Sequence, residues 1–71
     1  MLVSINGSKI TLFQGATLKH ALLKTDQNLY EAVMNKQAVI KDQEGNLTNI
    51  NGAAADGWAY TIETTEAYKQ L

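Results

Sequence analysis

Residues 2–23 read LVSINGSKITLFQGATLKHALL, and this stretch decides the fold that we expect. Apolar and polar residues alternate on both sides of Asn6-Gly7. That dipeptide favours the two positive φ angles of a type I′ turn, which joins two antiparallel strands. The chain is therefore predicted to open with a β-hairpin whose strands cover residues 2–5 and 8–13.

A helix is predicted directly after the hairpin. Gln14-Gly15-Ala16 has the composition of a turn, and Thr17 can cap a helix that begins at Leu18. Leu18, Ala21 and Leu22 then follow at the spacing of one helical face. An apolar helical face needs a sheet or a second helix to cover it.

A second helical pattern follows, in which Leu29 and Val33 are four residues apart. Asn28 and Glu31 stand at capping-box spacing, with asparagine in the serine position. The pattern predicts either a separate short helix or a broken continuation of the first one.

The second half of the chain is predicted to supply three more strands. These strands cover residues 38–41, 47–50 and 58–63, with turns at 43–46, 51–52 and 56–57. They must join the hairpin in one sheet if the helix is to bury its apolar face. We expect Leu22, Ile40 and Ile62 to lie in that core, and residues 64–71 to form a polar tail or a weak terminal helix.

The ordered set of these segments resembles the ubiquitin-like β-grasp domains. Gly15-Ala16-Thr17-Leu18 is similar to their strand-to-helix turn, and Asp56-Gly57 before the last strand is similar to their final turn. The resemblance implies an α+β fold with a mixed sheet of four to five strands, and one main helix packed across one face. It also implies that the first and last strands are parallel and central. The length of the chain and the absence of any linker predict that residues 1–71 form a single domain, with a polar tail at 64–71.

Among β-grasp domains, the chain is most similar to the small sulfur carriers of thiamine and molybdopterin biosynthesis, and to related domains appended to larger enzymes. Those carriers end in Gly-Gly, whose carboxylate is adenylated and then thiolated. This chain ends in Gln70-Leu71, and Trp58 stands where the carriers often hold an acidic residue. Because of these two differences, a sulfur carrier or a diverged relative is the alternative function and not the leading one.

The composition excludes several other classes of function. The chain has no cysteine, so disulfides and thiolate chemistry are excluded, and we expect a cytoplasmic protein. No apolar run is long enough to span a membrane, and the N-terminus lacks the pattern of a signal peptide. The six lysines are scattered and arginine is absent, so we expect no nucleic-acid partner.

No set of residues predicts catalysis or a bound cofactor. His20 is the only histidine, and we expect it to be exposed and idle, because no nucleophile or second ligand stands nearby in the pattern. Asp42, Glu44 and Asn46 alternate around Gly45 but lack calcium-loop spacing, so we interpret them as a polar turn. We interpret Gly15-Ala16-Thr17 as a turn and not as a phosphate loop.

We therefore expect a non-catalytic module without metal or cofactor, which binds another protein through a sheet face or an edge strand. Trp58 and Tyr68 are the candidate binding residues. Trp58 begins a strand beside a turn, where burial is often partial, and an exposed tryptophan makes a strong contact. The sequence leaves open whether Trp58 belongs to the core or to the surface, and whether Tyr68 packs on the sheet or anchors the tail elsewhere.

Overall fold

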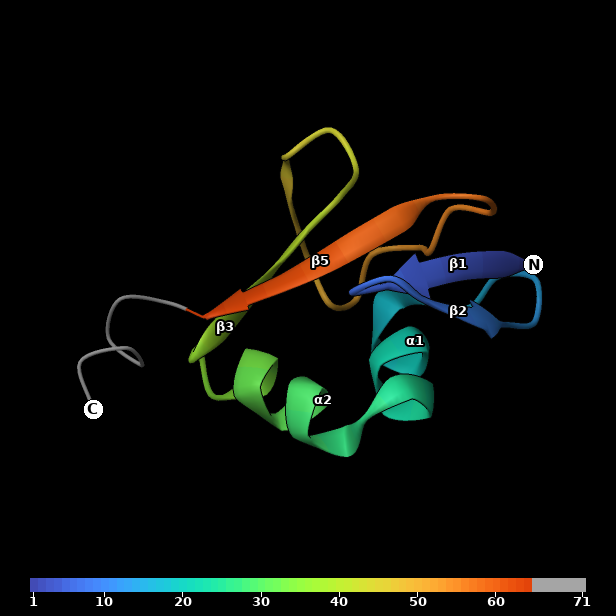
Figure 1. Cartoon of the computed structure of the whole chain (residues 1–71). Helices are drawn as coiled ribbons and strands as arrows, with labels where there is room; N and C mark the ends of the chain where they lie inside the picture. Colours follow the sequence, from blue (N-terminus) through green and yellow to red (C-terminus); the bar gives the residue numbers. More distant parts are fainter. Residues whose placement is uncertain (65–71) are drawn as a thin grey trace.

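The computed structural model describes residues 1–64, which form two helices on one side of a five-stranded mixed sheet (Figure 1). The strands are β1 (Leu2–Ile5), β2 (Ser8–Thr11), β3 (Ala38–Lys41), β4 (Leu47–Thr48) and β5 (Ala59–Thr64), and the helices are α1 (Leu18–Thr25) and α2 (Gln27–Met34). The predicted α+β class and mixed sheet are confirmed. The prediction of one main helix is replaced by two helices of eight residues each.

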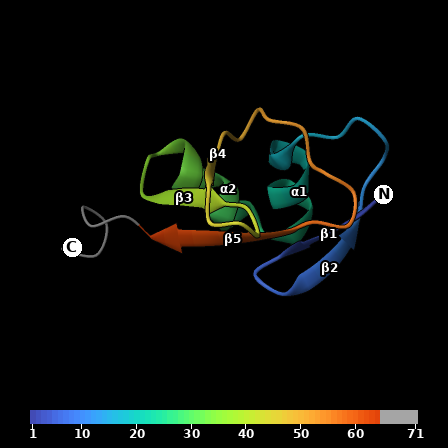
Figure 2. The same cartoon turned by 90° about the horizontal axis from the view of Figure 1, so that it is seen from above.

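The sheet has the strand order β2-β1-β5-β3-β4. Strands β1 and β5 are parallel, and every other neighbouring pair is antiparallel. The N–H groups of Ser4 and Asn6 donate to the carbonyl oxygens of Trp58 and Tyr60, each at 3.0 Å. The prediction that the first and last strands are parallel and lie inside the sheet is thus confirmed, as Figures 1 and 2 show.

The first hairpin forms as its sequence predicts. Asn6 and Gly7 have φ angles of 50° and 86°, which are the positive values that a type I′ turn requires. The Oδ1 atom of Asn6 also accepts a hydrogen bond of 2.9 Å from the N–H of Ile62 in β5. Strand β2 ends at Thr11 and not at residue 13, although Leu12 still exchanges main-chain hydrogen bonds of 2.7 and 2.6 Å with Met1.

A single residue separates the two helices. Asp26 has an extended backbone, with φ −165° and ψ 120°, and its N–H ends α1 by donating to the carbonyl oxygen of Leu22 at 2.8 Å. Its Oδ1 atom accepts from the N–H of Asn28 at 2.9 Å and so caps α2. The predicted cap at Asn28 is wrong, because the aspartate two residues earlier already occupies that role.

Strand β4 contains two residues instead of the four predicted, because the chain after Thr48 turns toward α1. The carbonyl oxygens of Ile50 and Gly52 accept hydrogen bonds from the N–H groups of Lys19 and Leu18, at 2.9 and 3.0 Å. The first turn of a helix has no internal acceptors for these N–H groups. The segment after β4 therefore completes the start of α1 instead of extending the sheet.

The hydrophobic core lies between the helices and the sheet. Its largest fully buried side chains are Val3, Ile5, Leu18, Leu22 and Ile40. Leu22 and Ile40 were predicted there, but Ile62 is only half-buried. Strand β1 pairs with β5 only as far as Tyr60, so Ile62 has a neighbouring strand on one side alone.

Candidate protein-binding surface

The side of the sheet that faces away from the helices is open in the described part of the chain. Cross-strand pairing places alternate residues of all five strands on this face, namely Leu2, Ser4, Lys9, Thr11, Val39, Lys41, Leu47, Ala59, Thr61 and Glu63. Most of these side chains are small or polar. The apolar exceptions are Leu2 at one side of the sheet and the pair Val39 and Leu47 at the other.

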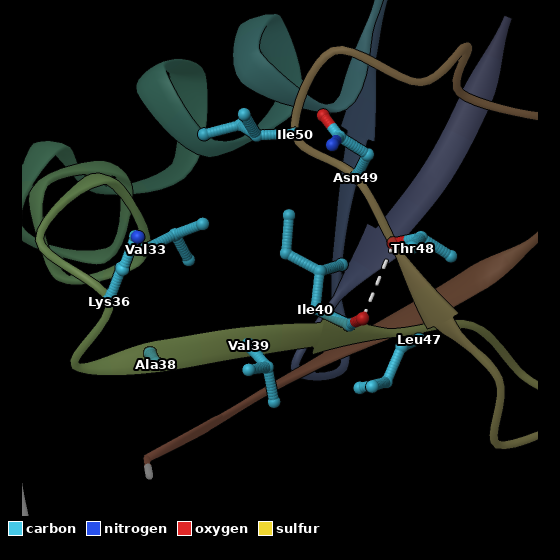
Figure 3. Close-up of a pocket in the computed structure, with 9 residues that line it drawn as sticks. All are labelled: Val33, Lys36, Ala38, Val39, Ile40, Leu47, Thr48, Asn49 and Ile50. Carbon is cyan, nitrogen blue, oxygen red and sulfur yellow. Dashed lines mark hydrogen bonds between the residues drawn. The ribbon is translucent and has the colours of Figure 1, made fainter. Parts of the chain in front are cut away.

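Val39, Lys41, Leu47 and Glu63 form a compact group that we call the open-face patch. Leu47 lies directly opposite Lys41 across the β3–β4 pair, which makes it a diagonal neighbour of Val39. The Leu47 side chain is the most exposed large apolar one among residues 1–64, at 69% of its full area. Figure 3 shows that Val39 and Leu47 point to the same side of β3, away from α2.

An ion pair borders these two aliphatic side chains. The Nζ atom of Lys41 lies 3.4 Å from Oε1 of Glu63, and the side chains are 37% and 49% exposed. A pair this exposed contributes only about 0–1 kcal/mol to stability, since water and salt screen it. Its more important effect is to place a positive charge opposite Leu47 and a negative charge opposite Val39.

A groove lies along the same edge, between α2, β3 and the segment that follows β4, and it shares Val39 and Leu47 with the open-face patch. Its volume is about 460 Å³, and its walls are made by Val33, Lys36, Ala38, Val39, Ile40, Leu47, Thr48, Asn49 and Ile50. Figure 3 shows the side chain of Ile40 pointing into the space between Val33 and Ile50. The Oγ1 atom of Thr48 donates to the carbonyl oxygen of Ile40 at 3.3 Å, and so holds the two strands together where the groove begins.

Of the two predicted binding residues, Trp58 lies in the described part of the chain. Trp58 lies in the turn before β5, half-buried against the core, and its main chain bonds to Ala55 and Ser4. Tyr68 lies outside the described residues, so both assignments stay predictions. The sequence missed Val39 and Leu47 as a pair, because alternation shows which face each residue takes but not the register that sets two strands side by side.

His20 is exposed as predicted, but it is not idle. Its Nδ1 atom accepts a hydrogen bond of 3.0 Å from the N–H of Thr17 and lies 3.0 Å from the Thr17 Oγ1 atom. Its ring also contacts Phe13 edge to face, with centroids 5.0 Å apart. His20 therefore acts as the returning half of a capping box, the role that Glu or Gln usually takes at the third helical position.

In the turn at residues 42–46, the aspartate side chain binds main-chain N–H groups of the same turn. One carboxylate oxygen of Asp42 accepts from the N–H groups of Glu44 and Asn46, at 2.9 and 3.0 Å. The interpretation as a polar turn is confirmed. In the region that the structure describes, no three histidine, cysteine or acidic side chains gather as metal ligands would.

Both helices of residues 1–64 are too short and too polar to cross a lipid bilayer. The features that remain as candidates are the open-face patch and the groove, which meet at the β3–β4 edge and share Val39 and Leu47. Comparisons with protein-family models, with curated proteins and with solved structures gave no match to this chain.

Proposed function

We propose that this chain is a non-catalytic, protein-binding domain of the β-grasp type, and that the open-face patch is its contact surface. The observation that carries the proposal is the exposure of Leu47, at 69%, beside Val39 on a sheet face that no described element covers. Leu47 and the partly exposed Val39 form one apolar patch, and an exposed apolar patch with polar residues at its border is typical of an interaction surface.

The β-grasp assignment is supported by the strand order β2-β1-β5-β3-β4 with parallel β1 and β5, and by helices on one side only.

The non-catalytic assignment is supported by the structural hydrogen bonds that the His20 and Asp42 side chains make. The ring nitrogen of His20 accepts a main-chain hydrogen bond, and the carboxylate of Asp42 holds its own turn. The hydroxyl group beside His20 is the Oγ1 atom of Thr17, which belongs to the same capping box at the start of α1.

The chemistry of the patch indicates what kind of partner fits it. Complete burial of a leucine side chain yields about 1.5–3 kcal/mol, which makes Leu47 the largest source of binding energy on this face. Lys41 lies opposite Leu47 and Glu63 lies opposite Val39, so the patch favours a partner whose apolar pocket has charged groups of both signs along one side.

Site-specific photo-crosslinking tests the proposal. A photoreactive phenylalanine analogue is placed at Leu47 in one variant and at Lys9 in a matched variant, since Lys9 lies on the same face but at the opposite edge. We expect a protein that crosslinks from position 47 and not from position 9. Once that protein is purified, Leu47→Asp should weaken its binding at least tenfold, and Lys9→Asp should change it less than twofold.

Two outcomes would contradict the proposal. Equal crosslinking from both positions would indicate nonspecific contact. Unchanged binding by a folded Leu47→Asp variant would show that the patch is not the contact surface. Because Leu47 is an exposed residue, its substitution should leave the unfolding midpoint nearly unchanged.

A further inference from the structure

Strand β2 forms one edge of the sheet, and no described strand lies beyond it (Figure 2). In an antiparallel pair, alternate residues turn their N–H and C=O groups toward the same neighbouring strand. Met1 and Leu12 exchange hydrogen bonds of 2.6 and 2.7 Å, so the main chain of Leu12 faces β1, and that of Ile10 does the same. The main-chain groups of Lys9 and Thr11 therefore point outward, where a further strand could pair with them.

The Lys24 side chain occupies one of these outward groups. From α1, its Nζ atom donates a hydrogen bond of 2.6 Å to the carbonyl oxygen of Thr11. Both residues are exposed, so water competes for the two groups and the bond contributes little to stability. The bond nevertheless holds a charged group across the outer edge of β2.

The two edges of the sheet differ in how they are protected. An edge strand can pair with another chain unless it is short, contains proline, is interrupted by a bulge or carries charged side chains. Strand β4, at the other edge, has only two residues. Strand β2 has four residues in unbroken register with β1 and contains no proline. Charge is therefore the protection that remains for β2, and Lys9 and Lys24 supply it.

The outward groups of β2 fit a second copy of the same strand. When two β2 strands pair antiparallel about a two-fold axis at Ile10, Lys9 of each copy lies opposite Thr11 of the other. Each of these two pairs can exchange two main-chain hydrogen bonds, and the carbonyl oxygen of Thr11 accepts one of them. Because Lys24 already donates to that oxygen in each copy, half of the bonds between the copies are blocked.

We propose that the hydrogen bond from Lys24 to Thr11 keeps the β2 edge closed to a second copy of this chain. When Lys24 no longer donates to Thr11, β2 pairs with the β2 strand of the second copy, and the two sheets become continuous. The open-face patch lies at the opposite edge of the sheet and contains neither residue. This inference therefore does not depend on the proposed function.

Sedimentation velocity of the unaltered chain and two variants tests the inference. Lys24→Met removes the donor but keeps a long, unbranched side chain. Lys19→Met is the matched control, because it removes the same charge from the same helix, and the exposed Lys19 side chain makes no hydrogen bond or ion pair within residues 1–64. We expect Lys24→Met to lower the dissociation constant of the dimer about tenfold or more, since two further hydrogen bonds become possible. Lys19→Met should change it less than twofold.

Amide hydrogen exchange locates the contact between the copies. In the unaltered chain, the N–H groups of Lys9 and Thr11 point away from β1 and should exchange rapidly. In Lys24→Met, both should exchange more slowly as the protein concentration rises. Adding Thr11→Pro removes one outward N–H but no bond to β1, so the double variant should dissociate as readily as the unaltered chain. Where the proline disrupts the fold, exchange in Lys24→Met alone decides the matter.

Three results would overturn the inference. A Lys24→Met variant that sediments like the unaltered chain would show that the bond to Thr11 does not keep the edge closed. Equal association of Lys24→Met and Lys19→Met would indicate a general effect of lost charge. Slowed exchange at Leu47, and not at Lys9 and Thr11, would place the contact at the open-face patch instead.

Discussion

Substitutions of Asn6 test how much the contact between the first hairpin turn and β5 contributes to stability. It occupies the first central position of the hairpin turn with φ 50°, and its Oδ1 atom accepts the N–H of Ile62 at 2.9 Å. Asn6→Gly keeps the left-handed backbone but removes the acceptor. Asn6→Ala removes the acceptor and also places a Cβ atom in a backbone region that alanine avoids.

The two substitutions should therefore differ by a predictable amount. Loss of one hydrogen bond costs about 0.5–1.5 kcal/mol, and left-handed alanine adds roughly 1–2 kcal/mol. The free energy of unfolding should fall by about 1 kcal/mol in Asn6→Gly and by about 2–3 kcal/mol in Asn6→Ala. Asn6→Asp retains an acceptor oxygen and tolerates positive φ, so it should remain close to the parent.

Thermal and urea unfolding followed by circular dichroism measure these differences. In a domain of this size, 1 kcal/mol corresponds to roughly 4–8 °C in the unfolding midpoint. A glycine variant as stable as the parent would show that the bond to Ile62 contributes nothing. An alanine variant no less stable than the glycine variant would refute the argument from backbone conformation.

The remaining predictions concern three other sites. Tyr60→Phe leaves the N–H of Ala55 without the phenol oxygen that now accepts it at 3.0 Å, and should cost about 1 kcal/mol in urea unfolding; a variant equal to the parent would contradict this. His20→Ala removes the acceptor for Thr17 and should lower the unfolding midpoint, whereas His20→Gln should restore it, because glutamine takes the same capping role. Leu22→Ala should cost roughly 2–5 kcal/mol, since its side chain is fully buried, and an unchanged midpoint would mean that the core has been misplaced.

The elements that the sequence predicted well are those whose signals are local. Asn6-Gly7 specifies its own turn, and Thr17 marks the start of α1 without reference to distant residues. The parallel pairing of β1 and β5 was predicted through a resemblance to known folds, because alternation alone does not give strand direction.

The elements that the sequence did not predict depend on partners far along the chain. Strand β4 is short because Ile50 and Gly52 satisfy the first N–H groups of α1, an arrangement that no local pattern reveals. Ile62 has the alternation of a core residue, but its burial depends on how far β1 extends beside it. The groove lies where β4 ends early, so neither it nor the open-face patch could be derived from the sequence. The sulfur-carrier alternative depends on residues 65–71, which lie outside the described part of the chain, and it stays a prediction.

The central position of β5 means that the sheet can be completed only late in protein synthesis. Strands β1 and β3 are made first, yet each has β5 as a hydrogen-bonded neighbour, so both keep an open edge until the ribosome has released residues 59–64. The first hairpin and the two helices can form from local contacts in the meantime, but the sheet cannot close. Nascent chains interrupted before β5 would expose the edges of β1 and β3 together, and such unpaired edges are where chaperones and other unfinished chains attach.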